Sequence, residues 1–507
     1  MNLICRPVVV ALALGALAAS LRAQCPDGTP PPCAAPVARA SAPASNSIAV
    51  LYFDTRDTTD RYLVDGLTEE IILRLQQLQR LEVKSRYESQ RVRGSRNLAP
   101  AAVGRTLGVR YLVNGTVQRS GERVVVRAEL TRADRAVDIW SERYDRSSGD
   151  VLDVIDAIAR GVATGVAGRL LPAEAAELGR RPTADPVAYE QFLRGNFYLA
   201  QRTAAGLAHA ADAYEAVARR DSTMKPALAR IAYAYVLGLA YGVGDLSRDS
   251  ILARARRADA RAMQAAPEAS DTWLAHGFLL ATTTLLALGD NMSEARVAMA
   301  RAVEIDPGNP EAHHQFAQVL VFLGEDSLAE TEYHRALALE PGRAVTLQEI
   351  GTLMVQEARY PEALRWGDSA IGVDPNLARA YEVRALAHLG LGETAAARAD
   401  IEHGMGLATG AMVDELRSFR AMILAAAGDT LAARREANAL TNPSAISGWV
   451  MGLGLAQLGD YGRALDLLEA IPSPLARCWA TRYYSQPAMR AEPRFMRIVA
   501  ACPGRRT

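Results

Sequence analysis

Cysteines are the residues of this chain whose spacing best suits chemistry. Cys478 and Cys502 lie near the C-terminus, Cys25 and Cys33 lie near the N-terminus, and the fifth, Cys5, is among the first residues of the chain. In an oxidising compartment each pair can close a small loop as a disulfide, whereas in a reducing cytosol the thiols would stay free. Linking Cys478 to Cys502 closes a loop of about 25 residues, which the chain-entropy estimate values at ~3 kcal/mol. We predict this disulfide first and Cys25–Cys33 second.

No catalytic or cofactor-binding pattern accompanies the cysteines. The chain has no Cys-x-x-Cys, no Walker glycine loop with Lys, no His-Glu-x-x-His and no Gly-x-Ser-x-Gly. His313 and His314 are adjacent, so they point to different sides of a helix and do not suit a metal pair. Carboxylates are abundant, but they mark helix starts and solvated faces more often than acid–base dyads. We therefore expect no enzyme activity, no catalytic residue, no cofactor and no metal site.

Composition limits the class of partner. The chain has 507 residues, enough for two or three domains, with 50% hydrophobic residues but only 6% aromatic ones. Such a composition suits small-residue helices that pack closely. Lys plus Arg equals Asp plus Glu at 57 each, so no basic surplus favours a phosphate backbone. Nucleic acid is not an expected partner.

Small residues and prolines recur at a step of 34. Asp306-Pro307 and Glu340-Pro341 are one step apart, and Asp374-Pro375 continues the same register. Gly324-Glu325 and Gly392-Glu393 share another register, and Gly428-Asp429, Gly459-Asp460 and Gly289-Asp290 look like the same signal in less regular units. Two alanine columns keep the step as well: Ala295, Ala329, Ala363 and Ala397, and Ala302, Ala336 and Ala370. Gly ends one helix in the left-handed conformation, Pro closes the next, and alanines let neighbouring helices approach. The pattern predicts stacked helix pairs that begin near 187, 226, 269, 310, 344, 378, 411 and 444.

These residues resemble the tetratricopeptide repeat family. In its pattern Phe316, Ala317 and Leu320 take packing places on a first helix, and the second-helix and closing places fall on Ala329, Tyr333, Ala336 and Pro341. The resemblance implies a superhelix whose first helices line a groove that binds a protein or peptide. Family positions place the following residues along that groove: Glu311, His314, Gln315, Gln318, Gln348, Thr352, Arg379 and Glu382. This lining is polar and mixed in charge, and it lacks the Lys/Arg and Asn set with which some members clamp a C-terminal carboxylate. A partner with a mixed surface is therefore expected rather than an acidic tail.

The N-terminus predicts export. Arg6 precedes an apolar run from Val8 to Ala19, and Ala23 is a small-residue cleavage site. The run is short for a bilayer-spanning helix, which needs about 20 apolar residues. A periplasmic or otherwise exported chain is the first interpretation, and an inner-membrane anchor made by an uncleaved signal is the alternative. A segment rich in Pro, Ala and Ser then reads as a linker.

An α/β domain follows the linker. Ile48–Phe53 and Leu81–Val83 read as strands, Asp65 to Gln79 as an amphipathic helix and Ala101–Leu107 as a short one. Three further strands (Val109–Gln118, Arg123–Thr131 and Val137–Glu142) and a closing helix from Asp150 to Leu170 complete the order. This order predicts a mixed sheet with helices on one side.

The same stretch resembles the TolB amino-terminal-like domain, which is related to the FlgO family. The similarity is carried by 48–53, 64–70, 107–117 and 140–146, and Tyr52 stands where that family usually has Pro. It implies a fold found in envelope proteins, and one found between membrane anchors and repeat arrays in bacterial signalling proteins. It brings no catalytic role.

The predicted organisation has six parts. They are a signal peptide at 1–23, a linker at 24–46, the α/β domain at 47–171, a hinge at 172–186, about eight tetratricopeptide repeats at 187–472 and a capping segment at 473–507. We interpret the chain as an exported non-enzymatic scaffold of the bacterial cell envelope, with membrane contact only if the signal stays uncleaved. The alternative is a regulatory protein whose α/β domain senses and whose repeats relay to a partner.

The signal segment yields the first prediction. Cleavage after Ala23 should give a mature chain that begins at Gln24 outside the cytoplasm. N-terminal sequencing of the protein from fractionated cells measures this. Soluble cytosolic protein that still begins at Met1 or Asn2 would contradict it.

Overall fold

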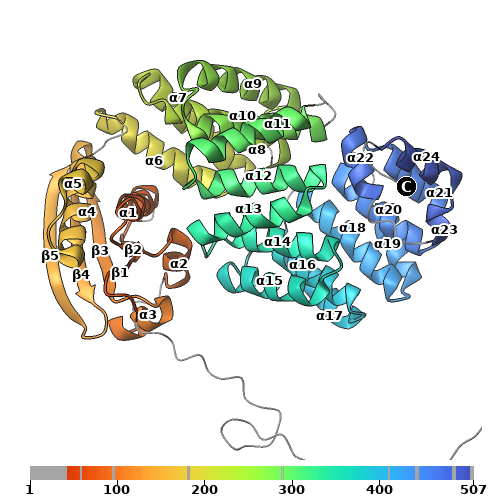
Figure 1. Ribbon diagram of the computed structural model, residues 1–507, viewed down its shortest axis with the longest axis horizontal. Helices are drawn as coiled ribbons and strands as arrows, with labels where there is room; N and C mark the ends of the chain where they lie inside the picture. The colour runs from red at the N-terminus through yellow and green to blue at the C-terminus, as the bar shows by residue number, and fades with distance from the viewer. Residues whose placement is uncertain are drawn as a thin grey trace, which may run out of the picture. The chain divides into compact units, whose positions relative to one another are not determined.

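The computed structural model describes residues 43–57, 60–93, 98–179, 183–241, 243–286, 288, 291–408, 411–439, 445–481 and 487–502. The predicted signal segment, nearly all of the linker, Cys25 with Cys33, and Gly289-Asp290 lie outside these residues. Residues 44–507 form one compact unit. It consists of a sheet with its helices, followed by a long array of helix pairs (Figure 1).

A five-stranded mixed sheet forms the first part, as the sequence predicts. Its strands are β1 (Ser47–Val50), β2 (Glu82–Val83), β3 (Tyr111–Ser120), β4 (Arg123–Arg132) and β5 (Val137–Ser147), in the spatial order β2-β1-β3-β4-β5. β1 pairs in parallel with β2 and β3, and β3, β4 and β5 form an antiparallel meander. Gly121, at φ +59°, supplies the left-handed residue of the tight turn between β3 and β4.

Helices cover the sheet on both faces. α1 (Arg61–Gln76) and α4 (Val151–Ala167) share a core with Ile48 and Val50 of β1. Side chains alternate along a strand, so Ala49 faces the other side, where it packs with α3 (Pro100–Leu107). The expectation that helices lie on one side therefore holds for α1 and α4 but not for α3.

One helix of this domain was not predicted. α2 (Arg86–Arg91) begins at Ser85, whose hydroxyl accepts a hydrogen bond from the Glu88 backbone, while the Glu88 carboxylate accepts one from the Ser85 backbone. This reciprocal pair is a capping box. Its Ser-x-x-Glu signal is readable in the sequence, but the helix is too short to show a period.

The segment predicted as a hinge contains another helix, α5 (Pro172–Leu178). Pro172 occupies the first turn, where a missing N–H costs nothing, and the Glu174 carboxylate accepts a hydrogen bond from the Leu171 N–H at 2.8 Å. Leu178 is fully buried, and the Arg74 guanidinium of α1 donates to its carbonyl at 3.2 Å. The prolines mark a helix start, so half of this segment is anchored to the α/β core.

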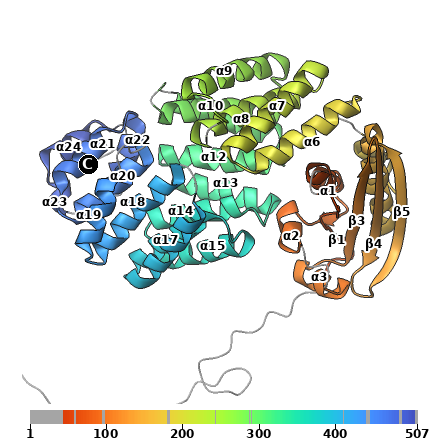
Figure 2. The same cartoon turned by 180° about the vertical axis from the view of Figure 1, so that it is seen from behind.

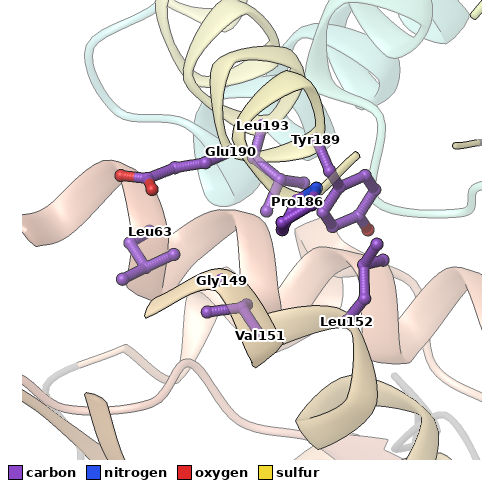
Figure 3. Close-up of a pocket in the computed structure, with 8 residues that line it drawn as sticks. All are labelled: Leu63, Gly149, Val151, Leu152, Pro186, Tyr189, Glu190 and Leu193. Atoms are coloured by element: carbon purple, nitrogen blue, oxygen red, sulfur yellow. The ribbon is translucent and has the colours of Figure 1, made fainter. Parts of the chain in front are cut away.

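The α/β domain continues into the first helix pair. Figure 3 shows Leu63 of α1 and Leu152 of α4 beside Tyr189 and Leu193 of α6 (Pro186–Ala200), which belong to the same hydrophobic core. The depression they line is a packing seam, since these four side chains are at most 4% exposed. At its edge the Tyr62 hydroxyl donates to Glu190 at 2.6 Å. The α/β domain thereby covers the apolar end of the array.

Eight helix pairs are described between 186 and 469 (Figures 1 and 2). Their first helices begin at 186, 226, 270, 310, 344, 378, 411 and 445, within one residue of the starts expected from the sequence. After α6, the helices of these pairs are, in chain order, α7 (Ala204–Arg220), α8 (Pro226–Tyr241), α9 (Arg248–Ala265), α10 (Ser270–Leu285), α11 (Met292–Ile305), α12 (Pro310–Leu323), α13 (Asp326–Leu339), α14 (Ala344–Gln356), α15 (Tyr360–Val373), α16 (Ala378–Gly390), α17 (Thr394–Leu407), α18 (Ala411–Ala426), α19 (Thr430–Ala439), α20 (Ala445–Gln457) and α21 (Tyr461–Glu469). The even-numbered helix of each pair is its first helix.

Three short helices end the described chain: α22 (Pro474–Ala480), α23 (Pro487–Arg490) and α24 (Pro493–Ala500). Met489 and Phe495 belong to the core of the last repeats, so this segment closes the array at that end. Cys478 and Cys502 form a disulfide with their Cα atoms 5.5 Å apart. No helix in the described part of the chain has both the length and the apolar composition that a bilayer crossing requires.

Both alanine columns are buried to 0% exposure in every member. Ala329 on α13 should therefore accept no larger side chain. We expect Ala329→Trp to lower the free energy of unfolding by about 1 to 3 kcal/mol or more through overpacking. Ala338→Trp is the matched control, because Ala338 is exposed on the same helix. The measurement is the midpoint of denaturant-induced unfolding, and equal midpoints for the two variants would refute the assigned register.

The turn between α14 and α15 lacks the expected glycine. Ala358 lies 34 residues after Gly324 and 34 before Gly392, and all three have positive φ (+58°, +79° and +81°). A left-handed alanine is strained, whereas glycine is not. We expect Ala358→Gly to raise the free energy of unfolding by about 0.5 to 1 kcal/mol and Gly324→Ala to lower it by a similar amount. Changes of the same sign in the two variants would count against this account.

Candidate partner-binding face

Seven of the eight residues expected to line a groove fall into three columns at the 34-residue step, and the eighth is Gln315. The first column is Glu311, Val345 and Arg379, the second is His314, Gln348 and Glu382, and the third is Gln318, Thr352 and Leu386. All lie on the first helices α12, α14 and α16. A step of 34 residues places the members of a column at equivalent points of successive first helices. They therefore point in the same direction and are buried to a similar extent.

The second column is not a solvated lining. His314, Gln348 and Glu382 are only 2%, 4% and 6% exposed, and Gln315 is 3% exposed. They lie where successive first helices pack on each other; for example, His314 Nδ1 is 3.0 Å from the Thr346 hydroxyl of α14. These four side chains are therefore closed to solvent, and their part in partner binding stays a prediction. The first and third columns flank this contact and remain half-buried.

An ion-pair cluster surrounds Glu311. Its carboxylate accepts hydrogen bonds from the Arg343 guanidinium, from the Tyr233 hydroxyl at 2.5 Å and from the Gln315 amide at 2.9 Å, and Arg202 lies 4.0 Å away. Arg343 is 2% exposed and also pairs with Glu340 at 3.0 Å. These contacts join α8, α12 and the turn before α14, so the cluster fixes three repeats relative to one another.

The cluster determines the protonation of its members. Burial alone raises the pKa of Glu311, but the attraction of Arg343 and Arg202 outweighs it and holds that pKa well below the ordinary value. Burial and the nearby Arg343 lower the pKa of His314 to about 3. Glu311 is thus ionised and His314 neutral at physiological pH.

A second cluster surrounds Arg379. Its guanidinium donates two hydrogen bonds to Glu415 of α18, at 2.9 and 2.7 Å, and lies 4.0 Å from Glu382. Burial, followed by repulsion from Glu415, raises the pKa of Glu382 to about 8. Burial also raises the pKa of Glu349 on α14. One arginine therefore balances a set of buried carboxylates that links α14, α16 and α18.

Sequence analysis missed Arg343. Arg343 follows Glu340-Pro341-Gly342. The equivalent residue in the preceding turn is Asn309, whose side chain caps α12 by accepting hydrogen bonds from the Glu311 N–H at 3.1 Å and the Ala312 N–H at 3.1 Å. An arginine in the place of a capping asparagine is a departure from the repeat, and this departure is the signal that could have found it.

The histidines point apart, as expected for neighbours on a helix. His313 lies against the second helix of its own repeat, with Nδ1 2.6 Å from Glu332 Oε2 and Nε2 3.0 Å from the Pro307 carbonyl oxygen. His314 lies against α14 instead. No group of three metal-ligand side chains occurs among the described residues.

Glu311 yields a stability prediction with a pH dependence. Arg343→Met should lower the free energy of unfolding by about 3 kcal/mol at pH 7, because it leaves a largely buried carboxylate without its main cation. The folded pKa of Glu311 is depressed, so the wild-type advantage exists above the ordinary value of 4.5 and is lost as the pH falls below it. Urea unfolding at pH 7 and pH 3.5 measures both effects. Arg365→Met, at a side chain 71% exposed, is the control; a pH-independent loss would rule out the ionic explanation.

Comparisons with known proteins cover only part of the chain. No family model matches it. Over 154 residues, 30% of the chain, it is 34% identical to the "Putative adenylate cyclase 3" of Rhizobium meliloti, of which it covers 26%. Over 73 residues, 14% of the chain, it is 37% identical to the type IV pilus assembly protein PilF of Pseudomonas aeruginosa, of which it covers 29%. The chain thus spans less than a third of either relative.

Two solved structures align with part of this chain at low TM-scores. A tetratricopeptide repeat protein of Parabacteroides merdae is 16% identical, with a TM-score of 0.36 over 53% of this chain and 98% of that one. The structure of PilF from Pseudomonas aeruginosa is 24% identical, with a TM-score of 0.30 over 40% of this chain and 90% of that one. The described helix pairs follow the register that the 34-residue step predicts, and the similarity to PilF is confined to 73 residues of the chain.

Proposed function

We propose that the chain is an exported, non-enzymatic scaffold of the bacterial cell envelope that binds protein partners through its repeats and its α/β domain. Tetratricopeptide arrays bind proteins, and one relative is named a type IV pilus assembly protein. The apolar N-terminal run supports export, and a disulfide near the C-terminus suits an oxidising compartment.

The observation that carries this proposal is the pair of half-buried columns on α12, α14 and α16. Gln318, Thr352 and Leu386 repeat the same orientation on successive first helices. The buried second column beside them makes the surface rigid, because its side chains are packed in place. A rigid row that mixes amide, hydroxyl and apolar groups suits an extended protein segment with a mixed surface.

Of the groove residues inferred from the family, the accessible ones carry the proposed contacts. Gln318 and Thr352 belong to the third column, and Glu311 and Arg379 belong to the first, where ion pairs already hold them. The buried members His314, Gln315, Gln348 and Glu382 support the surface from beneath. The resemblance to the TolB amino-terminal-like domain suggests that the α/β domain binds a second envelope component.

A matched pair of threonines tests the binding row. Thr352 on α14 and Thr331 on α13 each donate a hydrogen bond from the hydroxyl to the carbonyl four residues earlier, at 3.2 and 3.0 Å, but Thr331 is exposed on a second helix. Thr352→Arg should reduce partner capture from envelope fractions about tenfold or more, since a bulky cation would obstruct the row. Thr331→Arg should leave capture unchanged. Equal capture by both variants would exclude this row as the binding surface.

The second candidate function is regulation or signal transduction, and the match to a protein named an adenylate cyclase favours it. Under this alternative the α/β domain senses and the repeats relay. Incubating the purified chain with ATP and Mg²⁺ and measuring cyclic AMP separates enzyme from scaffold. We expect no product above the blank, and cyclic AMP formation would overturn the scaffold.

A further inference from the structure

The short helix α22 bridges parts of the array that are far apart in sequence. Its Leu475 packs against the hydrophobic cluster that runs from α6 to α16, whereas its Ala480 belongs to the cluster of the last repeats. The Trp479 ring lies 5.3 Å from Phe322 at the end of α12 and 5.3 Å from Trp449 of α20, measured between ring centroids. α22 therefore connects the last repeats to the middle of the array.

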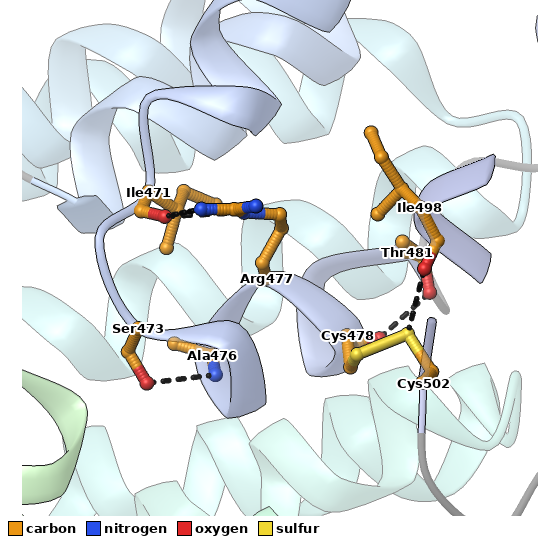
Figure 4. The surroundings of a disulfide bond; sticks show 8 residues. All are labelled: Ile471, Ser473, Ala476, Arg477, Cys478, Thr481, Ile498 and Cys502. Atoms are coloured by element: carbon orange, nitrogen blue, oxygen red, sulfur yellow. Dashed lines mark hydrogen bonds between the residues drawn. A yellow bond between two sulfur atoms is a disulfide. The ribbon is translucent and has the colours of Figure 1, made fainter. Parts of the chain in front are cut away.

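The disulfide holds α22 from its other side. Cys478 precedes Trp479, and its bond to Cys502 ties the last turn of α22 to the residues that follow α24 (Figure 4). Hydrogen bonds secure the backbone nearby: the Thr481 hydroxyl donates to the Cys478 carbonyl at 2.7 Å, and the Arg477 guanidinium donates to the Ile471 carbonyl at 2.7 Å. Both cysteine residues are half-buried rather than buried, which leaves part of their surface open to a small thiol.

The bridge depends on this link because α22 is short. A helix of seven residues is unstable by itself, and its position must come from packing and from covalent attachment. Without the disulfide, the chain fixes α22 only through the segment that follows α21, and the Trp479–Phe322 contact must hold the other end. The bond thus reduces the conformations that α22 can reach away from α12.

We propose that Cys478–Cys502 is a redox latch that keeps α22 docked on α12, and that a dithiol reductant releases it. One thiolate of the reductant attacks a sulfur of the bond, which gives a mixed disulfide and a cysteine thiolate. The second thiol of the reductant then displaces the remaining cysteine. Two electrons and two protons pass to the protein, which gains two thiols, and the reductant leaves as a cyclic disulfide. Undocking removes the contact that α22 makes between the last repeats and α12.

Hydrogen exchange on the full chain tests the latch. We compare the oxidised protein, the same protein in dithiothreitol, and the Cys478→Ser/Cys502→Ser variant. In both states that lack the disulfide, amides of 474–480 and of 320–323 should exchange about tenfold faster or more. Amides of α14, α15, α20 and α21 should not change. The dithiothreitol measurement starts from folded protein, so it decides the question even if the variant folds poorly.

A variant with the disulfide intact tests the Trp479–Phe322 contact separately from the disulfide. Trp479→Ala removes the ring that meets Phe322, so it should speed exchange at 320–323 without any reductant. Unchanged exchange of 474–480 after reduction would overturn the proposal. Faster exchange throughout α18–α21 would also overturn it, because the bond would then stabilise the end of the array rather than hold one helix.

Discussion

Close approach of helices through alanine is the constraint on which this molecule depends. Four successive repeats place an alanine methyl group at one point of the second helix, three of them place another seven residues later, and every member of both columns is fully buried. Dispersion between backbones at short range then contributes packing energy in a chain with only 6% aromatic residues. Repetition of one contact gives successive pairs the same orientation.

That repetition explains how much of the fold can be predicted from the sequence. A step of 34 between glycines, alanines and prolines predicts the helix pairs and their starts, since each signal acts within its own unit. The burial of His314, Gln348 and Glu382 could not be predicted in the same way. Position along a helix gives the direction of a side chain, but burial also depends on how closely the next first helix approaches.

Local departures from the repeat are where prediction fails. Pro172 reads as a break but starts a helix, because proline suits the first turn. Ala358 reads as an ordinary helix former but takes the left-handed place of a glycine. Arg343 reads as a surface charge in a turn but is buried in an ion pair with Glu311. Only for Arg343 does the deciding partner, Glu311, lie outside the local sequence.

The shared core at the seam between α1 and α6 has a consequence for how this protein can change in length. Tyr189 and Leu193 belong to the α/β core as much as to the first repeat, and the far end is closed by α24 and a covalent bond. A helix pair added before α6 or after α21 would separate a cap from the surface it covers. The interior unit 310–343 is tied to the C-terminal segment as well, because its Phe322 contacts Trp479 of α22. Gain or loss of repeats by duplication or deletion is therefore confined to those interior units that contact neither end of the array.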